Sequence, residues 1–288
     1  MLRLIGKTNE AITHYRKALI LNPRFSVAHI NLGNLLSDLG ETSEALASYE
    51  AAVHADPDNT DARNNLGLML EQLGRSDDAI SHYRQVLSRN SNHVATLINF
   101  GAALADQGKY EDATACYRHV LAIQPDHAEA LNNLGNALTY QRRFGEAITS
   151  FDRALELRPD YAEARTNLGH VYQHLGRFSE ATACYRQAIA VDPNYAEGHF
   201  NLSLILLQCG EFRKGWQEYA WHWRRKRARP RPFQSTLENG MELNGQNVFV
   251  HNEQGLGDEL FFLRFLPWLK SAGAKKITYL PNPKLAPI

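Results

Sequence analysis

A regular row of asparagines is the feature of this 288-residue sequence best suited to chemical recognition. They recur at 34-residue intervals, at Asn31, Asn65, Asn99, Asn133, Asn167 and Asn201. A carboxamide offers one acceptor and two donors, so a row of amides on one surface can pair with the N–H and C=O groups of an extended peptide. Asparagine is a poor residue for a helix interior, so its repetition needs a reason. Further asparagines thicken this lining: Asn34, Asn64, Asn132 and Asn136.

Two interpretations of the asparagine row stay open at this stage. In the first, the amides bind the backbone of a partner peptide. In the second, each amide bonds to a neighbouring helix and holds the helices at a fixed spacing.

A glycine-rich loop near the C-terminus is the second candidate. It consists of Glu253, Gln254, Gly255, Leu256, Gly257 and Asp258. The loop follows a predicted strand at 247–251 and precedes a predicted helix at 259–273, with a second strand predicted at 276–280. Its backbone N–H groups and the helix N-terminus suit an anionic or hydroxyl-rich ligand. It is not the dinucleotide fingerprint, because Leu260 stands where the third glycine would be.

Metal and thiol chemistry find little support. His170 and His174 are four residues apart on one predicted helix, but no third ligand and no HExxH glutamate accompany them. We therefore expect solvated groove residues. The three cysteines, Cys116, Cys184 and Cys209, form no CxxC pair, and the first two occupy the same position in different repeats. We expect them to be packing residues, and we expect no metal site and no cofactor.

The elements that position the asparagines follow from a 34-residue period. An alanine column and an aromatic column keep this period in phase over six cycles, and a glycine column keeps it over five, with Ser203 as the variant in the last repeat. The alanines are Ala11, Ala45, Ala79, Ala113, Ala147 and Ala181; the rings are Tyr15, Tyr49, Tyr83, Tyr117, Phe151 and Tyr185; the glycines are Gly33, Gly67, Gly101, Gly135 and Gly169. This pattern resembles the tetratricopeptide repeat (TPR), which implies an all-α superhelical solenoid of antiparallel helix pairs. The resemblance covers residues 1–223, with a partial first repeat, five full repeats and a variant last repeat.

The columns also predict how the helices pack. Small residues of the Gly33 and Ala45 type allow the two helices of a repeat to approach closely, and we expect the Tyr49-type ring to fill the gap between neighbouring repeats. Arg142 stands where Gly40, Gly74, Gly108 and Gly176 turn the corner between helices. We expect a slightly different turn at Arg142.

The period ends in an aromatic-rich segment, 215–223, and a basic one. We expect Trp216, Trp221 and Trp223 to pack between the solenoid and the domain that follows. The linker 224–242 begins with six positive charges within 224–232. We interpret them as a solvated linker or a patch facing an acidic neighbour rather than a nucleic-acid contact.

The last segment, 243–288, carries a second resemblance. The string EQGLGDELFFLRFLPWLKSAGA after a TPR array looks like bacterial TPR proteins whose C-terminal domain is similar to GT-B glycosyltransferases. The repeats resemble those of the O-linked N-acetylglucosamine transferase family, whose asparagine ladder binds peptides. The resemblance implies that Asp258, beside Glu253, is a candidate base; capping of the helix N-terminus is the open alternative.

The same resemblance limits what this chain can do. A GT-B enzyme needs two Rossmann-like halves, and 243–288 matches only the start of the first. We therefore expect a truncated α/β segment, a chain inactive by itself, and a nucleotide-sugar bound only by a full-length parent.

Composition narrows the functional class. The 31 Lys and Arg residues balance the 31 Asp and Glu residues, which removes a global electrostatic case for nucleic acid. No apolar run approaches the ~18 residues of a membrane span, and the start of the chain is not a secretory signal. We therefore expect a cytoplasmic scaffold that binds extended protein or peptide clients, the acceptor-recruiting part of a glycosyltransferase. The alternative is that the parent is itself a TPR-containing glycosyltransferase that transfers sugar to protein or glycan acceptors.

Overall fold

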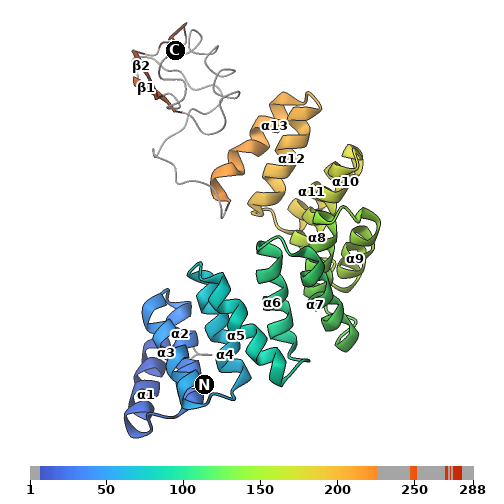
Figure 1. Cartoon of the computed structure of the whole chain (residues 1–288). Helices are drawn as coiled ribbons and strands as arrows, with labels where there is room; N and C mark the ends of the chain where they lie inside the picture. Colours follow the sequence, from blue (N-terminus) through green and yellow to red (C-terminus); the bar gives the residue numbers. More distant parts are fainter. Residues whose placement is uncertain (1–6, 226–246, 252–269, 272, 274, 281–288) are drawn as a thin grey trace. The chain divides into compact units, whose positions relative to one another are not determined.

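The computed structural model describes residues 7–225, 247–251, 270, 271, 273 and 275–280. By their internal contacts, the residues divide into two units, 1–228 and 229–288. Each unit is described by itself. Within residues 7–225 the chain is helical throughout (Figure 1). The α-helices are α1 (Thr8–Leu21), α2 (Ser26–Asp38), α3 (Thr42–Ala55), α4 (Thr60–Gln72), α5 (Ser76–Arg89), α6 (Val94–Asp106), α7 (Tyr110–Ile123), α8 (Ala128–Tyr140), α9 (Phe144–Leu157), α10 (Ala162–His174), α11 (Phe178–Val191), α12 (Ala196–Gln208) and α13 (Phe212–Tyr219).

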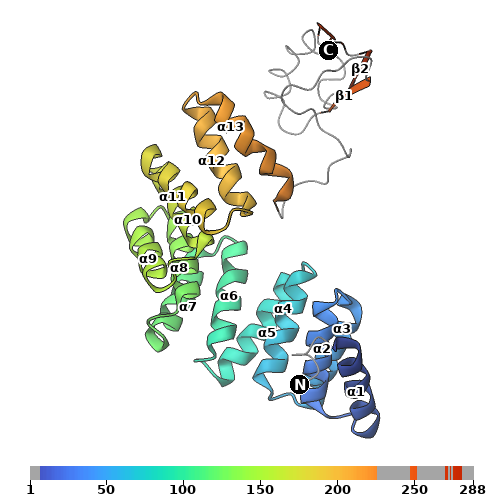
Figure 2. The ribbon, with the colours of Figure 1, turned by 180° about the vertical axis from the view of Figure 1, so that it is seen from behind.

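Each even-numbered helix pairs with the helix that follows it, and the pairs stack in one curved row (Figures 1 and 2). The even-numbered helices also contact the next even-numbered helix along the row. This additional contact places them on the inner side of the curve, where a solenoid presents its concave surface. The predicted all-α solenoid is confirmed.

In the five helix pairs from α2–α3 to α10–α11, an aromatic ring of one helix packs against a glycine of the other. The alanine column from Ala45 to Ala181 is fully buried. A Cβ added at Gly101 would lie 2.7 Å from the ring of Tyr117, and the same holds within 0.2 Å for the other pairs of this column. The ring therefore packs first inside its own pair, which the sequence analysis did not predict. It reaches the next pair as well, since Tyr83 lies 6.5 Å from the ring of Phe100.

The turn between the two helices of a pair contains one residue in the left-handed backbone conformation. The corner glycines have φ values such as +76° at Gly108 and +71° at Gly176. Arg142 adopts the same conformation, with φ of +60°. Its turn keeps the same bonds, because the Arg142 N–H donates to Thr139 O at 2.9 Å as that of Gly108 donates to Ala105 O at 2.9 Å. The prediction of a different turn is therefore wrong: the turn is unchanged, and the arginine adopts an unfavourable backbone conformation.

Aromatic side chains close the C-terminal end of this unit. After α13 comes a short 3₁₀-helix, η1 (Ala220–Arg224). Trp221 stacks on His199 of α12 with ring centroids 4.0 Å apart. Arg225, from the basic run, bonds to Glu197 at 2.8 Å and lies over the Phe200 ring at 3.9 Å. The start of the basic run thus faces an acidic neighbour, as one of the two interpretations of the linker predicts.

The second unit contains two strands at the predicted positions. β1 (Asn247–His251) and β2 (Lys276–Leu280) pair in parallel, with Asn247 opposite Lys276. The glycine-rich loop, with Glu253, Gln254, Gly255, Gly257 and Asp258, lies outside the described residues. One strand pair does not establish a Rossmann-like domain, so that part of the fold stays a prediction.

Candidate functional site

The asparagine row lies on the inner helices α2 to α12, one residue per repeat, as predicted for a concave surface. The side chains from Asn31 to Asn167 are half-buried, and Asn201 is buried. The regular spacing therefore places the amides in line along the groove. Their individual hydrogen bonds divide them into two groups.

Three members of the row form a hydrogen bond across a joint, meaning the contact between one inner helix and the next. Asn65 Nδ2 donates to Asn34 Oδ1 at 3.4 Å. Asn99 Nδ2 donates to Asn64 Oδ1 at 3.1 Å, and Asn167 Nδ2 donates to Asn132 Oδ1 at 2.9 Å. Asn201 is buried at the last joint and interacts with His170, an interaction that opposes the lowering of the His170 pKa. The hydrogen bonds of Asn65, Asn99 and Asn167 are of the kind that the second interpretation predicts.

Asn64 and Asn132 belong to the joints rather than to the groove lining. Asn64 is 6% exposed and Asn132 is fully buried. Asn64 also accepts from Thr96 Oγ1 at 2.9 Å, and Asn132 donates to Glu163 Oε1 at 3.4 Å. The prediction that these two side chains thicken an open amide surface is therefore wrong.

The asparagines of a second group have amide donors or acceptors that no group of the described protein uses. Within residues 7–225, the Asn31 and Asn136 side chains make no hydrogen bond to the protein, and Asn133 uses only its Oδ1, which accepts from Asn132 at 3.3 Å. The cause at Asn133 lies across the joint. Helix α6 carries Ile98 where α4 and α8 carry Asn64 and Asn132, so no oxygen stands at that position for the Asn133 amide.

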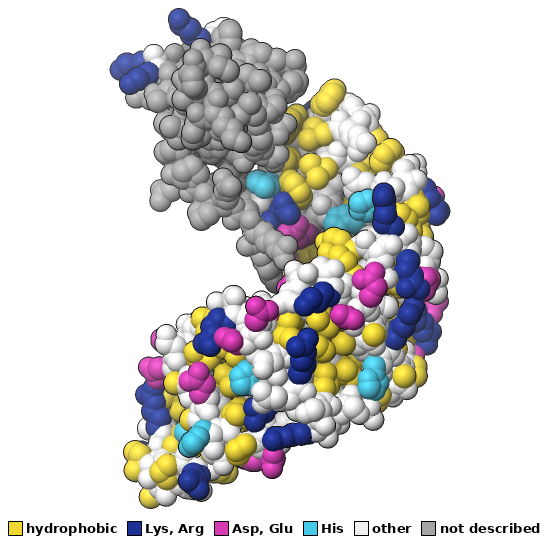
Figure 3. Space-filling model, viewed as in Figure 1, with side chains coloured by type: hydrophobic (Ala, Val, Ile, Leu, Met, Phe, Trp, Pro, Cys, Tyr) yellow, Lys and Arg dark blue, Asp and Glu magenta, His cyan; other side chains and the backbone are white. Residues whose placement is uncertain are grey.

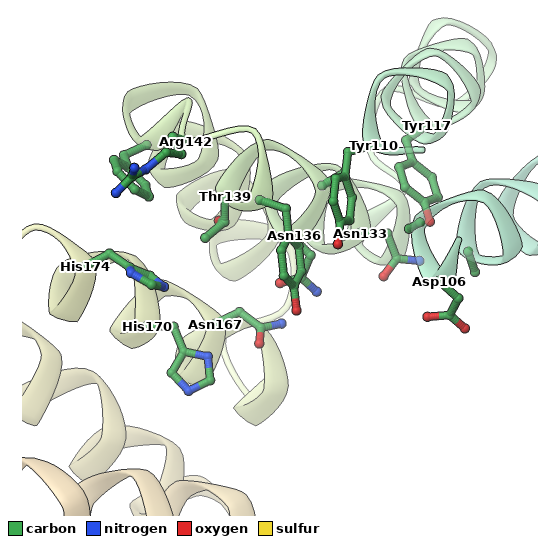
Figure 4. Close-up of a pocket in the computed structure, with 15 residues that line it drawn as sticks. Asp106, Tyr110, Tyr117, Asn133, Asn136, Thr139, Arg142, Asn167, His170 and His174 are labelled. Atoms are coloured by element: carbon green, nitrogen blue, oxygen red, sulfur yellow. The ribbon is translucent and has the colours of Figure 1, made fainter. Parts of the chain in front are cut away.

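The available amides open into a pocket of about 880 Å³ between α6 and α10 (Figure 4). Its wall includes Asn133, Asn136 and Asn167. Its depth comes from α6, where Ala102 and Ala105 occupy positions that hold His170 and Gln173 in α10. Two alanines thus hollow the groove at this repeat.

The Tyr117 hydroxyl lies in this pocket without a partner. In other repeats the corresponding hydroxyl is bonded: Tyr83 donates to Glu71 at 3.0 Å, and Tyr185 donates to Gln173 at 3.1 Å. Ala105 stands at the position of Glu71 and Gln173, so among the described residues Tyr117 finds no acceptor. Burial, followed by nearby negative groups, raises the pKa of Tyr117, so the hydroxyl is neutral and can both donate and accept.

Stacked rings form one edge of the pocket. Tyr110 and Tyr140 stack with centroids 4.6 Å apart and planes 2° apart, and Phe144 stacks on His174 at 5.8 Å. His170 is half-buried against the edge of Tyr185 at 5.9 Å, and burial lowers its pKa. The prediction of two solvated histidines therefore holds only for His174, which is exposed.

The acidic and the basic side chains of the pocket lie at opposite ends. Asp106 lies at one end, whereas Arg142 and His174 lie at the other (Figure 4). Elsewhere on the face shown in Figure 3, basic and acidic side chains are interspersed along the repeats. The groove is therefore polar and mixed in charge, which suits an extended polypeptide better than a polyanion.

Other candidate chemistry is absent from the described part of the chain. No group of three or more His, Cys, Asp or Glu residues there could hold a metal ion. Cys116 and Cys184 are buried and unpaired, and burial raises the pKa of each thiol to about 11, consistent with packing residues. The helices of this part of the chain include none with the length and hydropathy of a membrane-spanning segment.

The pocket was not foreseen from the sequence. Its signal was present as the substitution of two alanines into one inner helix, Ala102 and Ala105, and of a tyrosine at position 140. These departures from the repeat pattern have meaning only once the other repeats show what normally fills the space.

Comparisons with known proteins address the fold. Models of the tetratricopeptide repeat match residues 30–94, 92–160, 126–194 and 184–217. The chain resembles the structure of a tetratricopeptide repeat protein from Parabacteroides merdae, with 18% identity over 76% of this chain and 87% of that one, and a TM-score of 0.67. It also resembles PilW, described as a type IV pilus biogenesis factor, with 22% identity over 68% and 90% of the two chains and a TM-score of 0.64.

A third similar structure is YrrB, described as a TPR protein with an unusual peptide-binding site. The identity is 21% over 68% of this chain and 97% of that one, with a TM-score of 0.53. At these identities the structural likeness shows the fold alone. No curated protein matches the chain. The matched models and the helix-pair solenoid together show that this chain belongs to the tetratricopeptide repeat proteins.

Proposed function

We propose that this protein is a scaffold whose concave groove binds extended segments of partner proteins. The observation that carries the proposal is the set of uncommitted amides, above all Asn133 and Asn136, which open into the pocket between α6 and α10. An amide with free donors and acceptors can pair with a peptide backbone whatever the side chains of the peptide.

The asparagine row has a divided role in this proposal. Asn65, Asn99 and Asn167 hold the joints, while Asn31, Asn133 and Asn136 face the partner. Asn99 and Asn167 contribute to both roles, because each donates its Nδ2 to the joint and leaves its Oδ1 without a donor. The N–H groups of a bound peptide can donate hydrogen bonds to those oxygens.

The test compares two kinds of asparagine variant. A random ten-residue peptide library displayed on phage and selected on the intact chain supplies ligands. The double variant Asn133→Ala, Asn136→Ala should weaken the selected peptides about tenfold or more, at roughly 1 kcal/mol per lost hydrogen bond. Its melting temperature should hold or rise, because alanine is the better helix former.

The matched control is Asn132→Ala, in the same helix but within the joint. It removes the acceptor of Asn167, so its melting temperature should fall. Unchanged peptide affinity in the double variant would contradict the proposed role of the free amides. Failure of the intact chain to select any peptide would contradict the function.

A glycosyltransferase parent is the second candidate, favoured by the parallel strand pair β1–β2 at the bounds expected for the start of such a domain. In this candidate the groove recruits acceptors, Glu253, Gln254, Gly255 and Gly257 form a ligand loop, and Asp258 is the base. The nucleotide-sugar would require a second Rossmann-like half. A sugar-transfer assay on a chain that carries both halves tests this candidate, and absence of transfer excludes it.

A further inference from the structure

The end of the pocket formed by Ala102, Ala105, Asp106 and Tyr117 holds a polar group with no use in the fold. Tyr117 is 2% exposed, and its hydroxyl has no hydrogen-bond partner among the described residues. The hydroxyl oxygen is not among the fully buried unpaired polar atoms of the described residues, because it opens into the pocket, where a ligand group can bond to it. The packing of the repeat does not require the hydroxyl, because Phe151 fills the same position in the next repeat.

The electrostatic surroundings of this end are negative. Asp106 is exposed and forms no ion pair with another described residue. Asp106, Glu129 and Glu71 all act on the Tyr117 hydroxyl, and no cation is among the groups that do. The charge of Asp106 reaches Glu71 as well, where burial is the main cause of a raised carboxyl pKa. A positive group placed here gains favourable interactions.

The walls fit the remainder of a long side chain. Ala102 and Ala105 offer an apolar floor for a methylene stem. The stacked rings of Tyr110 and Tyr140 stand beside it, and aromatic faces attract ammonium and guanidinium groups. The opposite end, with Arg142 and His174, carries the other sign and gives a bound segment a direction.

From this geometry we propose that the Ala102–Tyr117 end of the pocket receives a basic side chain, arginine or lysine, from the extended partner segment. The cation donates to the Asp106 carboxylate and to the Tyr117 hydroxyl oxygen, and its stem lies on the two alanines. The proposal rests on the proposed function, since it specifies which segments the groove selects. An acidic side chain is repelled by Asp106, and a neutral apolar one leaves both polar groups unsatisfied.

Peptide selection on the intact chain tests the proposal. Peptides selected from the random library should be enriched in arginine or lysine at one position. Replacing that residue by glutamine should weaken binding about tenfold or more, as expected for a hydrogen bond to a charged group. In Asp106→Asn the same replacement should have little effect, because the partner charge is gone.

Two further variants keep the interpretation sharp. Ala105→Gln introduces the residue type that accepts a hydrogen bond from Tyr185 in a later repeat. The new glutamine should accept from the Tyr117 hydroxyl and fill this end of the pocket. The preference for a basic residue should then be lost, without loss of stability. Tyr117→Phe should weaken basic peptides while the melting temperature holds. Tyr185→Phe is its matched control: it loses the bond to Gln173, which lowers stability and leaves the basic preference unchanged.

The outcomes separate the two proposals. Selected peptides without a basic preference, or a preference that survives in both Asp106→Asn and Ala105→Gln, overturn this inference and leave groove binding intact. An intact chain that selects no peptide overturns the proposed function itself. A basic preference lost in both variants, with other peptides still bound, supports the inference.

Discussion

At the scale of single residues, Arg142 shows how strongly the repeat imposes its backbone. The corner needs a left-handed residue, and five other corners use glycine, from Gly40 to Gly210. In an L-residue with a side chain this conformation is unfavourable because Cβ crowds the following carbonyl oxygen. Packing of α8 against α9 nevertheless holds Arg142 at φ of +60°.

Arg142→Gly should therefore stabilise the solenoid by about 1 kcal/mol, since glycine removes the steric cost at this corner. Thermal or chemical unfolding measures the change. The reverse substitution at an equivalent corner, Gly108→Arg, should destabilise by a similar amount. An unchanged or lowered stability in Arg142→Gly would show that the arginine side chain contributes more than its backbone costs.

The asparagines show what a single sequence can say about residues. Their positions on the inner helices were predicted correctly from the period. Their partners were not, because a bond such as Asn99 to Asn64 joins residues 35 positions apart and depends on the separation of two helices. The sequence alone does not distinguish Asn133 and Asn136 from the asparagines whose side chains are hydrogen-bonded to a neighbouring helix. Neighbouring residues distinguish them: Ile98 stands across the joint from Asn133, and the helix pair of Asn136 has Phe151, which lacks the hydroxyl that Tyr49 donates to Asn34.

At the scale of helix pairs, the glycine–ring contact fixes how closely two helices approach. A Cβ at Gly135 would lie 2.7 Å from two ring atoms of Phe151, which is fully buried. The ring cannot move away without disturbing the neighbouring repeat. The contact thus explains why glycine and an aromatic residue recur together at this spacing.

Gly135→Ala should destabilise the solenoid by about 1–3 kcal/mol through overpacking. Gly145→Ala is the matched control, because a Cβ at Gly145 meets no atom within 4 Å and alanine is the better residue in helix α9. This control should stabilise by roughly 0.5–1 kcal/mol. Equal effects of the two substitutions on the melting temperature would contradict the packing role of Gly135.

The helix pairs themselves were predictable, and the pocket was not. Alanine, aromatic and glycine columns determine which faces meet, so the solenoid follows from the period. The pocket depends instead on small residues that depart from the pattern, Ala102 and Ala105, and on the Tyr110–Tyr140 stack between different repeats. Beyond the repeats, the strands at 247–251 and 276–280 were predicted from local patterning. The glycosyltransferase-like domain around them stays a prediction.

At the scale of the whole solenoid, residues in distant repeats contribute to the same free energy of unfolding. His82 on α5 and His170 on α10 both have pKa values lowered by burial. Around His82, the charges of Arg63 and Arg75 act in the same direction and those of Asp78 and Glu50 oppose it. Around His170, the interaction with Asn201 and the charge of Glu197 oppose the lowering, while His174 and Arg225 reinforce it.

Stability should therefore fall as the pH drops below about 6.5, where the unfolded chain binds protons that the folded chain excludes. Each histidine contributes at most about 1.4 kcal/mol per pH unit. Unfolding in denaturant at pH 7.5 and 5.5 measures the fall. His82→Gln should reduce it, whereas His54→Gln, at an exposed position, should not. A fall that is unchanged in His82→Gln would exclude His82 as a source.

A solenoid can bend elastically, and its joints differ in the hydrogen bonds that resist bending. Asn65, Asn99 and Asn167 each bridge a joint with an amide hydrogen bond, but no side-chain amide bond crosses from α6 to α8. That joint lies beneath the pocket, and we expect it to bend more easily than the three joints that carry such a bond. Pulling on the two ends of the array should open it there first. If a partner segment binds across α6 and α8 as proposed, its hydrogen bonds take the place of the missing amide bond, and we expect the partner to stiffen the array at this joint.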